Sequence, residues 1–115
     1  MVKVTQGDVY WYDFSEPRGA EPGYERPVVI IQGDAFNRSR LDTAVCVVLS
    51  TNTKQGGMPG NVLLQKKATG LDRDSVANVT QLQTVDRAFL RDHSGRIPPP
   101  KLDAILRGID TLLGR

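Results

Sequence analysis

The residues best suited to chemistry lie at the ends of two expected strands. Arg26 stands between a loop-forming stretch, "EPRGAEPGYE", and an apolar run, "RPVVIIQ". A buried strand needs no cation at its start, whereas a guanidinium matches a phosphate group in shape and charge. Ser50 and Thr51 end the next expected strand. If these strands pair antiparallel, Arg26 and the two hydroxyls meet at one end of a sheet, where they could hold a phosphate and stabilise charge building on it.

A structural interpretation of the same residues is equally open. Arg26 could form an ion pair with Glu21 or Glu25, and the two hydroxyls could merely end a strand. The residues alone do not decide between this interpretation and a phosphate site.

Other kinds of catalytic centre lack the residues that they need. The single histidine, His93, falls in an expected short helix, where a surface position is the simpler interpretation. Cys46 lies in mid-strand among valines, which favours a buried, unreactive thiol. No Cys/His cluster has the spacing of metal ligands, and no glycine motif for nucleotide phosphates is present. We therefore expect no metal and no other cofactor.

Strands dominate the first part of the expected structure. Alternating or continuous apolar runs bounded by turn residues predict them, and Pro27 is acceptable only because it stands near the start of its run. Two segments rich in glycine and proline, 16–25 and 51–60, must be loops, and the second could order over a ligand as a flap. The connector 33–42 has room for one helical turn. The expected strands are 7–14, 26–32, 43–50, 61–65 and one or two within 74–85.

A helical pattern replaces the strands after Val85. The segment 86–95 is expected to form a short helix, with Asp86 as its N-cap and Gly95 at its end. After three prolines, apolar residues recur at steps of three and four from Leu102 to Leu113, which predicts an amphipathic helix that must lie on the sheet. The predicted architecture is a small, strongly bent antiparallel sheet or barrel with a C-terminal helix packed against it.

Composition fits one globular domain spanning 1–115. The 39% hydrophobic and 24% charged contents are ordinary, and one cysteine cannot form an internal disulfide. No apolar run is long enough to span a bilayer and none resembles a signal peptide, so a cytoplasmic protein is expected. The net charge of +2 says little, but ten of the fifteen basic residues are arginine. Between Asp42 and Asp72 only basic charges occur, which suits either a solvated loop or a contact with a polyanion.

An ordered set of motifs runs through nearly the whole chain. It comprises G-D-x-x-W near the start, R-G-x-E followed by R-P-V-V-I-I, then D-x-F-N, "VVLSTN" and "GLDRDSVANVTQLQTVDRAFL". In this order they resemble the MazF/PemK/Kid family of toxins from bacterial type II toxin–antitoxin pairs. No single motif is specific, but the colinear set is.

The resemblance implies a fold and an activity. The fold is a small SH3-like barrel of the CcdB/PemK kind, which forms homodimers. The activity is metal-independent, sequence-specific cleavage of single-stranded RNA by attack of its 2′-hydroxyl, which leaves 2′,3′-cyclic phosphate and 5′-hydroxyl ends and inhibits translation and growth. A cognate antitoxin blocks the RNA groove with an extended acidic tail, and the complex binds DNA through the antitoxin. No membrane is involved.

The resemblance also assigns candidate site residues by position. Arg26 matches the catalytic arginine, Ser50 falls where many members have a catalytic threonine, Thr51 is the neighbouring hydroxyl, and Glu21 matches a loop glutamate. Tyr24 and Phe36 are expected to flank this centre as surfaces on which bases stack. The full set of expected RNA contacts is Arg18, Tyr24, Phe36, Asn37, Arg38, Lys54, Gln81 and Gln83.

This chain departs from the family pattern at two positions. Gln83 stands where many members have an arginine, and Thr80 where some have an acid, so the base preference does not carry over. Two alternatives stay open. A gyrase-binding toxin of the CcdB type relies on a C-terminal Trp-Gly-Ile, whereas this chain ends "LLGR". An inactive RNA- or antitoxin-binding barrel is disfavoured by the intact Arg26 and Ser50-Thr51.

Overall fold

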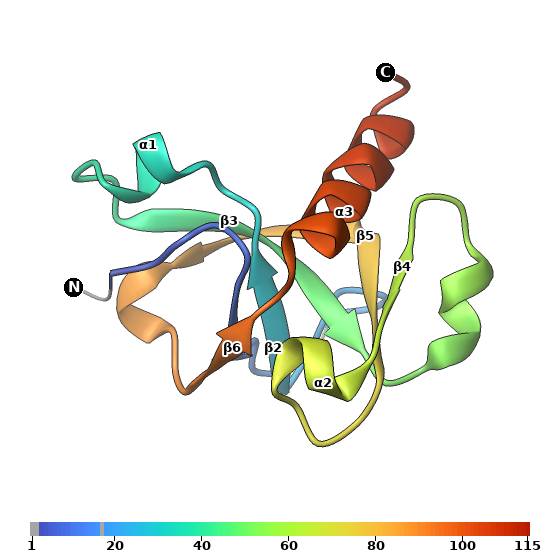
Figure 1. The fold of residues 1–115 in the computed structure, drawn as a ribbon. Coiled ribbons are helices and arrows are strands. Elements are labelled where there is room, and N and C mark those ends of the chain that lie inside the picture. The colour runs from blue at the N-terminus through green and yellow to red at the C-terminus, as the bar shows by residue number, and fades with distance from the viewer. Residues whose placement is uncertain (1–2, 17) are drawn as a thin grey trace.

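Six antiparallel strands build one curled sheet. A computed structural model describes residues 3–16 and 18–115. Figure 1 shows the sheet bending around the helix α3, with the short helices α1 and α2 at its margins. The strand order is β4-β5-β3-β2-β1-β6. The strands are β1 (Asp8–Asp13), β2 (Glu25–Ile30), β3 (Thr43–Ser50), β4 (Val62–Leu64), β5 (Ser75–Asp86) and β6 (His93–Arg96).

Helices and turns fill the connections. The structure contains α1 (Asp34–Asn37), the 3₁₀ turn η1 (Thr53–Gly57), α2 (Lys66–Thr69), the 3₁₀ turn η2 (Arg87–Phe89) and α3 (Pro99–Leu112). The helical turn expected in the connector 33–42 is confirmed as α1, whereas α2 was not predicted. The predicted mainly-β architecture with a C-terminal helix on the sheet is also confirmed. Among the described residues no helix has the length and apolar character that crossing a membrane requires.

Two side-chain clusters form the core because alternate residues of each strand point to opposite faces. On one face, Val9, Val29 and Val47 pack beneath Ile105 and Ile109 of α3; we call this cluster the helix-side core. On the other face, Tyr10, Val28, Ile30, Cys46 and Val48 pack with neighbours that include Val4 and Leu90; we call this cluster the second core. The predicted apolar stripe of α3 holds as far as Ile109, but Leu112 and Leu113 are exposed.

Of two expectations about the later half of the chain, the first is confirmed and the second needs correction. The segment 74–85 forms one long strand, β5, which is interrupted by a bulge where Val47 pairs with Leu82 and Val48 with Asn78. The short helix expected over 86–95 is wrong, because only η2 is helical and His93 begins β6, which pairs with β1. The expected capping role of Asp86 is confirmed within this shorter turn, where its carboxylate accepts a hydrogen bond from the backbone of Ala88.

Candidate functional site

The register of β2 and β3 brings Arg26 and Ser50 to the same end of the sheet. Val28 pairs with Val48 and Ile30 with Cys46, and continuing this antiparallel register places Arg26 opposite Ser50. Residues opposite one another project to the same face, with Cβ atoms about 4.5–5.5 Å apart. The β2–β3 pairs begin only after Pro27, which has no backbone N–H to donate. The antiparallel pairing predicted from the sequence is therefore confirmed.

Arg26 is half-buried and keeps its charge available. Its Nε donates to the carbonyl oxygen of Gly23 at 3.4 Å, which fixes the stem of the side chain. Among the described residues no carboxylate lies within ion-pair distance of it, so the alternative pairing with Glu21 or Glu25 is not formed. On its other side, Arg26 pairs with Tyr12 of β1.

The two hydroxyls differ in their surroundings. Ser50 is half-buried, and its Oγ accepts a hydrogen bond of 3.1 Å from the backbone N–H of Asn52. Since the oxygen acts as acceptor, the hydroxyl proton remains free to be donated. Thr51 is exposed at the start of the loop 51–60, and Lys54 is exposed in η1 within the same loop. The register favours Ser50 as the hydroxyl nearer to Arg26.

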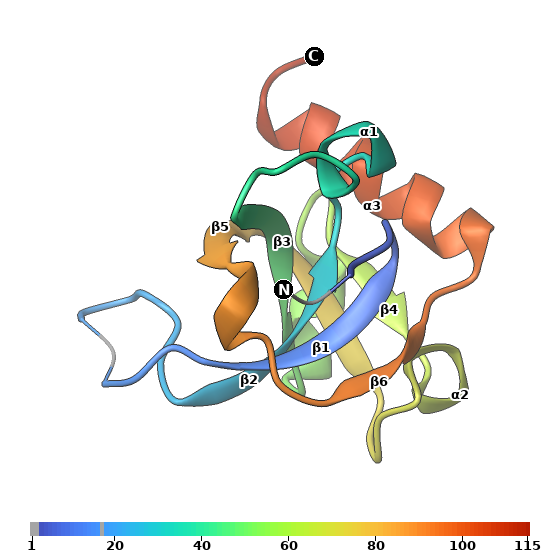
Figure 2. The ribbon, with the colours of Figure 1, turned by 90° about the vertical axis from the view of Figure 1, so that its left-hand side faces the viewer.

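The connection between β1 and β2 is held in a strained conformation at its base. Tyr24 and Ser15 have φ angles of 59° and 61°, in the left-handed region that bulky residues avoid. The backbone N–H of Tyr24 donates to the Ser15 carbonyl at 2.5 Å, and that of Phe14 donates to the Tyr24 carbonyl at 2.8 Å. Figure 2 shows this connection extending beyond the end of the β1–β2 pair. The conformation leaves the Tyr24 side chain 66% exposed two residues before Arg26.

Three of the expected site residues meet in a hollow beside this centre. Arg18 and Glu21 come from the β1–β2 connection, and Gln83 comes from β5. Gln83 pairs with Cys46 of the second core, so it projects from the same face as Arg26. Gln81 is half-buried within the β5 bulge. These three residues therefore share one hollow, although the sequence did not predict that they would meet.

Phe36, Asn37 and Arg38 do not join this centre. They belong to or follow α1, which comes after the opposite end of β2, and six residues of extended strand cover roughly 17–20 Å (Figure 1). The expectation that Phe36 flanks the site is therefore wrong, although its side chain is 62% exposed where it lies. The error arose because the sequence places Phe36 near Arg26, whereas an extended strand separates them.

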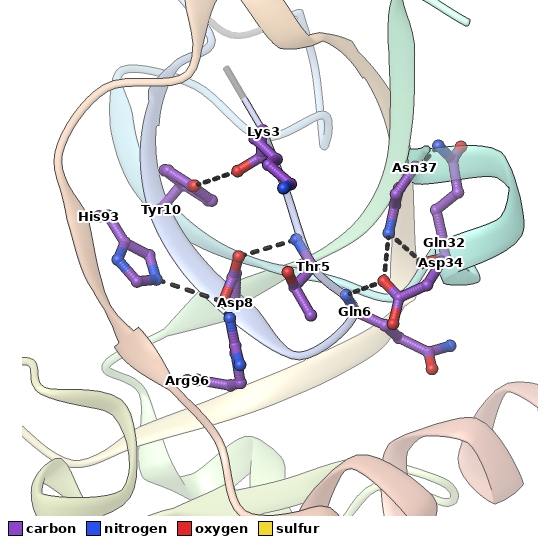
Figure 3. Close-up of polar contacts among 10 residues, drawn as sticks. All are labelled: Lys3, Thr5, Gln6, Asp8, Tyr10, Gln32, Asp34, Asn37, His93 and Arg96. Carbon is purple, nitrogen blue, oxygen red and sulfur yellow. Dashed lines mark hydrogen bonds and ion pairs between the residues drawn. The ribbon is translucent and has the colours of Figure 1, made fainter. Parts of the chain in front are cut away.

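Asn37 has a structural environment (Figure 3). Its side chain is buried, and its amide donates to the Gln32 carbonyl at 2.8 Å and to Asp34 Oδ1 at 3.1 Å. Its Oδ1 accepts from Gln32 Nε2 at 3.0 Å. An RNA contact through this amide would have to break these bonds, so its expected role there is disfavoured.

The basic residues between Asp42 and Asp72 belong to two different elements. Lys54 lies in η1, close in sequence to Ser50, whereas Lys66 and Lys67 lie in α2. The α2 turn is attached to β6 by a 2.6 Å hydrogen bond from Ser94 Oγ to the Thr69 carbonyl.

Sequence reasoning missed a buried polar cluster around Asp8. The Asp8 side chain is 4% exposed and accepts hydrogen bonds from Arg96 Nε at 2.8 Å and the Thr5 backbone at 2.8 Å (Figure 3). His93 Nε2 lies 3.3 Å from the same carboxylate, and its ring stacks at 4.9 Å on Tyr10. The hydrogen bond to Asp8 raises the pKa of Arg96. Arg96 balances the charge of Asp8. The hydrogen bonds that Asp8 accepts from Arg96 and Thr5 hold β6 and the N-terminal segment against β1.

The remaining reactive groups offer no second centre. Cys46 is buried, as expected, and its burial raises the pKa of the thiol to about 12. Within residues 3–16 and 18–115, no group of three or more His, Cys, Asp or Glu residues could hold a metal ion.

Comparison with known proteins identifies the family of this chain. The model of the family described as "PemK-like, MazF-like toxin of type II toxin-antitoxin system" matches residues 5–113. The chain belongs to this family. The resemblance drawn from the sequence motifs is thereby confirmed.

Curated relatives agree with the assignment. Endoribonuclease MazF6 of Mycobacterium tuberculosis (strain ATCC 25618 / H37Rv) is 39% identical over 110 residues, which cover 96% of each chain. Endoribonuclease EndoA of Bacillus subtilis (strain 168) is 33% identical over 102 residues, covering 89% of this chain and 87% of the relative. With such identity over almost its whole length, this family member is an endoribonuclease by enzyme class.

Solved structures show the same fold. MazF (Form-I) from Deinococcus radiodurans superposes with a TM-score of 0.81 at 21% identity and covers 100% of both chains. An endoribonuclease in complex with its cognate antitoxin from a mycobacterial species superposes with a TM-score of 0.78 at 23% identity, covering 96% of this chain and 95% of the other.

Proposed function

We propose that this chain is the toxin of a type II toxin–antitoxin pair and cuts single-stranded RNA at short sequence motifs, with no metal ion. The observation that carries the proposal is the placement of Arg26 opposite Ser50 at the open end of β2 and β3, with no carboxylate of the described chain paired to the guanidinium. The family and the enzyme class support the same conclusion.

The proposed reaction uses the RNA as its own nucleophile. The 2′-oxygen attacks the adjacent phosphorus, the bond from phosphorus to the 5′-oxygen breaks, and the products carry a 2′,3′-cyclic phosphate and a 5′-hydroxyl. Negative charge builds on the non-bridging oxygens as the pentavalent phosphorane forms. DNA has no 2′-hydroxyl and would therefore stay intact.

The residues of this centre take different roles in this scheme. A guanidinium stays protonated near neutral pH, so we assign Arg26 to stabilising the phosphorane charge rather than to accepting a proton. The Ser50 hydroxyl, or that of Thr51, donates to a non-bridging oxygen or to the leaving 5′-oxygen. A preorganised donor of this kind typically contributes about 3–4 kcal/mol to the barrier. Tyr24 offers an exposed ring for base stacking, and Arg18 and Lys54 offer charge to the backbone.

The proposed partners follow from the family. One structural neighbour is an endoribonuclease in complex with its cognate antitoxin and another is a MazE–MazF complex from Deinococcus radiodurans, and we propose that this chain likewise binds a cognate antitoxin, through an extended acidic tail. We further propose a homodimer in the cytoplasm whose RNA cleavage stops translation and growth.

The decisive experiment is cleavage of a long single-stranded RNA by the purified protein in EDTA. We expect discrete fragments with cyclic phosphate ends, and primer extension on them would give the motif. Arg26→Ala should abolish cleavage without lowering the unfolding temperature, while Arg107→Ala, an exposed arginine on α3, serves as the matched control. Cleavage by Arg26→Ala at a near wild-type rate would remove Arg26 from the mechanism, and intact RNA with inhibited gyrase supercoiling would favour the CcdB-type alternative.

The same assay separates the two hydroxyls. Because Ser50 faces the same side of the sheet as Arg26, Ser50→Ala should slow cleavage by about 100-fold or more, and Thr51→Ala by much less. The opposite order would assign the role to Thr51.

A further inference from the structure

A small hollow lies between the β1–β2 connection and β5, next to the candidate centre. Its volume is about 180 Å³, below the roughly 300–1,000 Å³ of pockets that hold drug-sized ligands. It therefore suits one small flat group rather than a length of chain. The described lining consists of Phe14, Glu16, Arg18, Glu21, Pro22 and Gln83.

The polar side chains of this hollow have no hydrogen-bond or ion-pair partners among the described residues. The Gln83 amide makes no side-chain hydrogen bond to them, and Arg18 forms no ion pair with Glu16 or Glu21 although all three line the same space. An amide offers a donor and an acceptor, a carboxylate offers acceptors, and a guanidinium offers donors. Hydrogen-bonding capacity of each kind is thus free for a ligand.

Gln83 is the best-positioned of these groups. It stands on β5, where its pairing with Cys46 ties it to the central strand β3 and to the second core. The other polar side chains come from an exposed connection. A group that discriminates between ligands must be held in place, and only Gln83 meets that condition here.

The apolar walls connect the hollow to the candidate centre. Phe14 lines the hollow and packs against Tyr12, with ring centroids 4.8 Å apart and planes tilted by 60°. Tyr12 is in turn the cross-strand neighbour of Arg26. A base in the hollow would contact Phe14 and Pro22 while a phosphate of the same strand lay near Arg26.

We propose that this hollow takes one unpaired adenine of the RNA substrate and that Gln83 determines the specificity for it. The inference rests on the proposed nuclease function and adds to it the identity of one recognised base. A glutamine amide can bond adenine at N6 and N7 together, accepting from the amino group and donating to the ring nitrogen. In this proposal the carboxylate of Glu21, which lines the same hollow, accepts a hydrogen bond from the second amino hydrogen. Gln83 acts on recognition and does not touch the reacting phosphate.

The test maps cleavage motifs on a randomised single-stranded RNA library by sequencing the fragment ends. We expect the wild-type protein to require adenine at one position, and Gln83→Ala to lose about 10- to 100-fold of that preference while still cutting other sites. Gln83→Arg should move the preference to guanine, because arginine bonds guanine at O6 and N7. Thr84→Ala is the matched control, since Thr84 is exposed, faces the other side of β5 and does not line the hollow.

A second readout does not depend on cleavage. Short RNAs carrying a 2′-deoxy residue at the cleaved position, with each of the four bases at the adenine position, are titrated against wild type and Gln83→Ala by fluorescence anisotropy. Loss of the adenine preference in the variant supports the proposal, while an unchanged motif in Gln83→Ala, or a preference for a base other than adenine, overturns it. A wild-type protein that cuts no RNA would instead overturn the nuclease function itself.

Discussion

A contact between two glycines holds the loop after Ser50 against α3, and it gives the sharpest test of the packing. Gly108 is buried in α3, and a Cβ added to it would lie 2.0 Å from the carbonyl oxygen of Gly60. Gly60 ends the loop 51–60 with a φ of +82°, and a Cβ there would in turn meet the Gly108 carbonyl at 2.8 Å. Figure 1 shows the segment leading into β4 running beside α3. The perturbation that we propose is Gly108→Ala.

The direction of the effect follows from two opposing contributions. Alanine in a helix interior is favoured over glycine by about 1 kcal/mol, so an unhindered substitution would raise the free energy of unfolding. Here, however, contacts under 3.0 Å essentially never occur for real Cβ atoms, and the obstructing atom is backbone. Inserting an extra methyl group into packed structure typically costs about 1–3 kcal/mol of stability. Because the methyl group meets backbone here, we expect a cost at the upper end of that range. We expect a net loss of about 1–2 kcal/mol, or about 4–8 °C in unfolding temperature at this chain length.

Thermal unfolding followed by circular dichroism at a fixed protein concentration measures this loss. Gly57→Ala is the matched control, because a Cβ at Gly57 meets nothing within 4 Å. Gly108→Ala should also slow RNA cleavage, since the loop that it displaces begins at Thr51 and carries Lys54. An unfolding temperature at or above that of the wild type would refute the account of the glycine contact.

Three further outcomes are expected. Burial raises the pKa of the Cys46 thiol to about 12, so the native protein should not react with a disulfide reagent at pH 8. Urea-unfolded protein should react at once. Fast reaction of the native protein would contradict the assigned burial. The pKa of Asp34 is lowered, chiefly by the hydrogen bond that its carboxylate accepts from the Gln6 backbone N–H. The stabilisation from this bond is complete above the unfolded-state pKa near 3.8 and is lost as the pH falls through the folded-state pKa. Asp34→Asn should therefore flatten the acid end of a stability–pH curve. Asp8→Ala removes the buried carboxylate that accepts hydrogen bonds from the Thr5 backbone and from Arg96 Nε, so it should lower the midpoint of a urea titration; an unchanged midpoint would show that these contacts are dispensable.

Where residue patterns are local, the sequence was sufficient to predict the structure. The run 43–50 is apolar and bounded by polar residues, and it forms β3 with the same limits. Pro27 confined β2 to a start close to Arg26, and the short connector forced β2 and β3 to be antiparallel. Those three facts were enough to bring Arg26 and Ser50 to one end of the sheet.

Where structure depends on distant partners, the sequence was not sufficient. The segment 86–95 has helix-like spacing, but pairing of His93–Arg96 with β1 makes its end a strand. Tertiary pairing outweighs local preference in such short segments. The Asp8 cluster joins residues 88 positions apart, which no local pattern reveals. Phe36 was misplaced for a similar reason, since nearness in sequence says nothing about which end of a strand a residue occupies.

The arrangement also explains how this fold can carry a variable recognition site beside a fixed reaction site. Arg26 and Ser50 belong to β2 and β3, and Val28 and Leu49 of these strands are fully buried in the second core and the helix-side core, so both strands are held in place. The described residues of the β1–β2 connection are mostly exposed, and those facing solvent can change without disturbing either core. Gln83 combines features of the strands and of the connection. Its backbone is part of the sheet, while its side chain faces the β1–β2 connection. In the proposed site, a substitution at such a position would alter which base is read without altering where the phosphate lies.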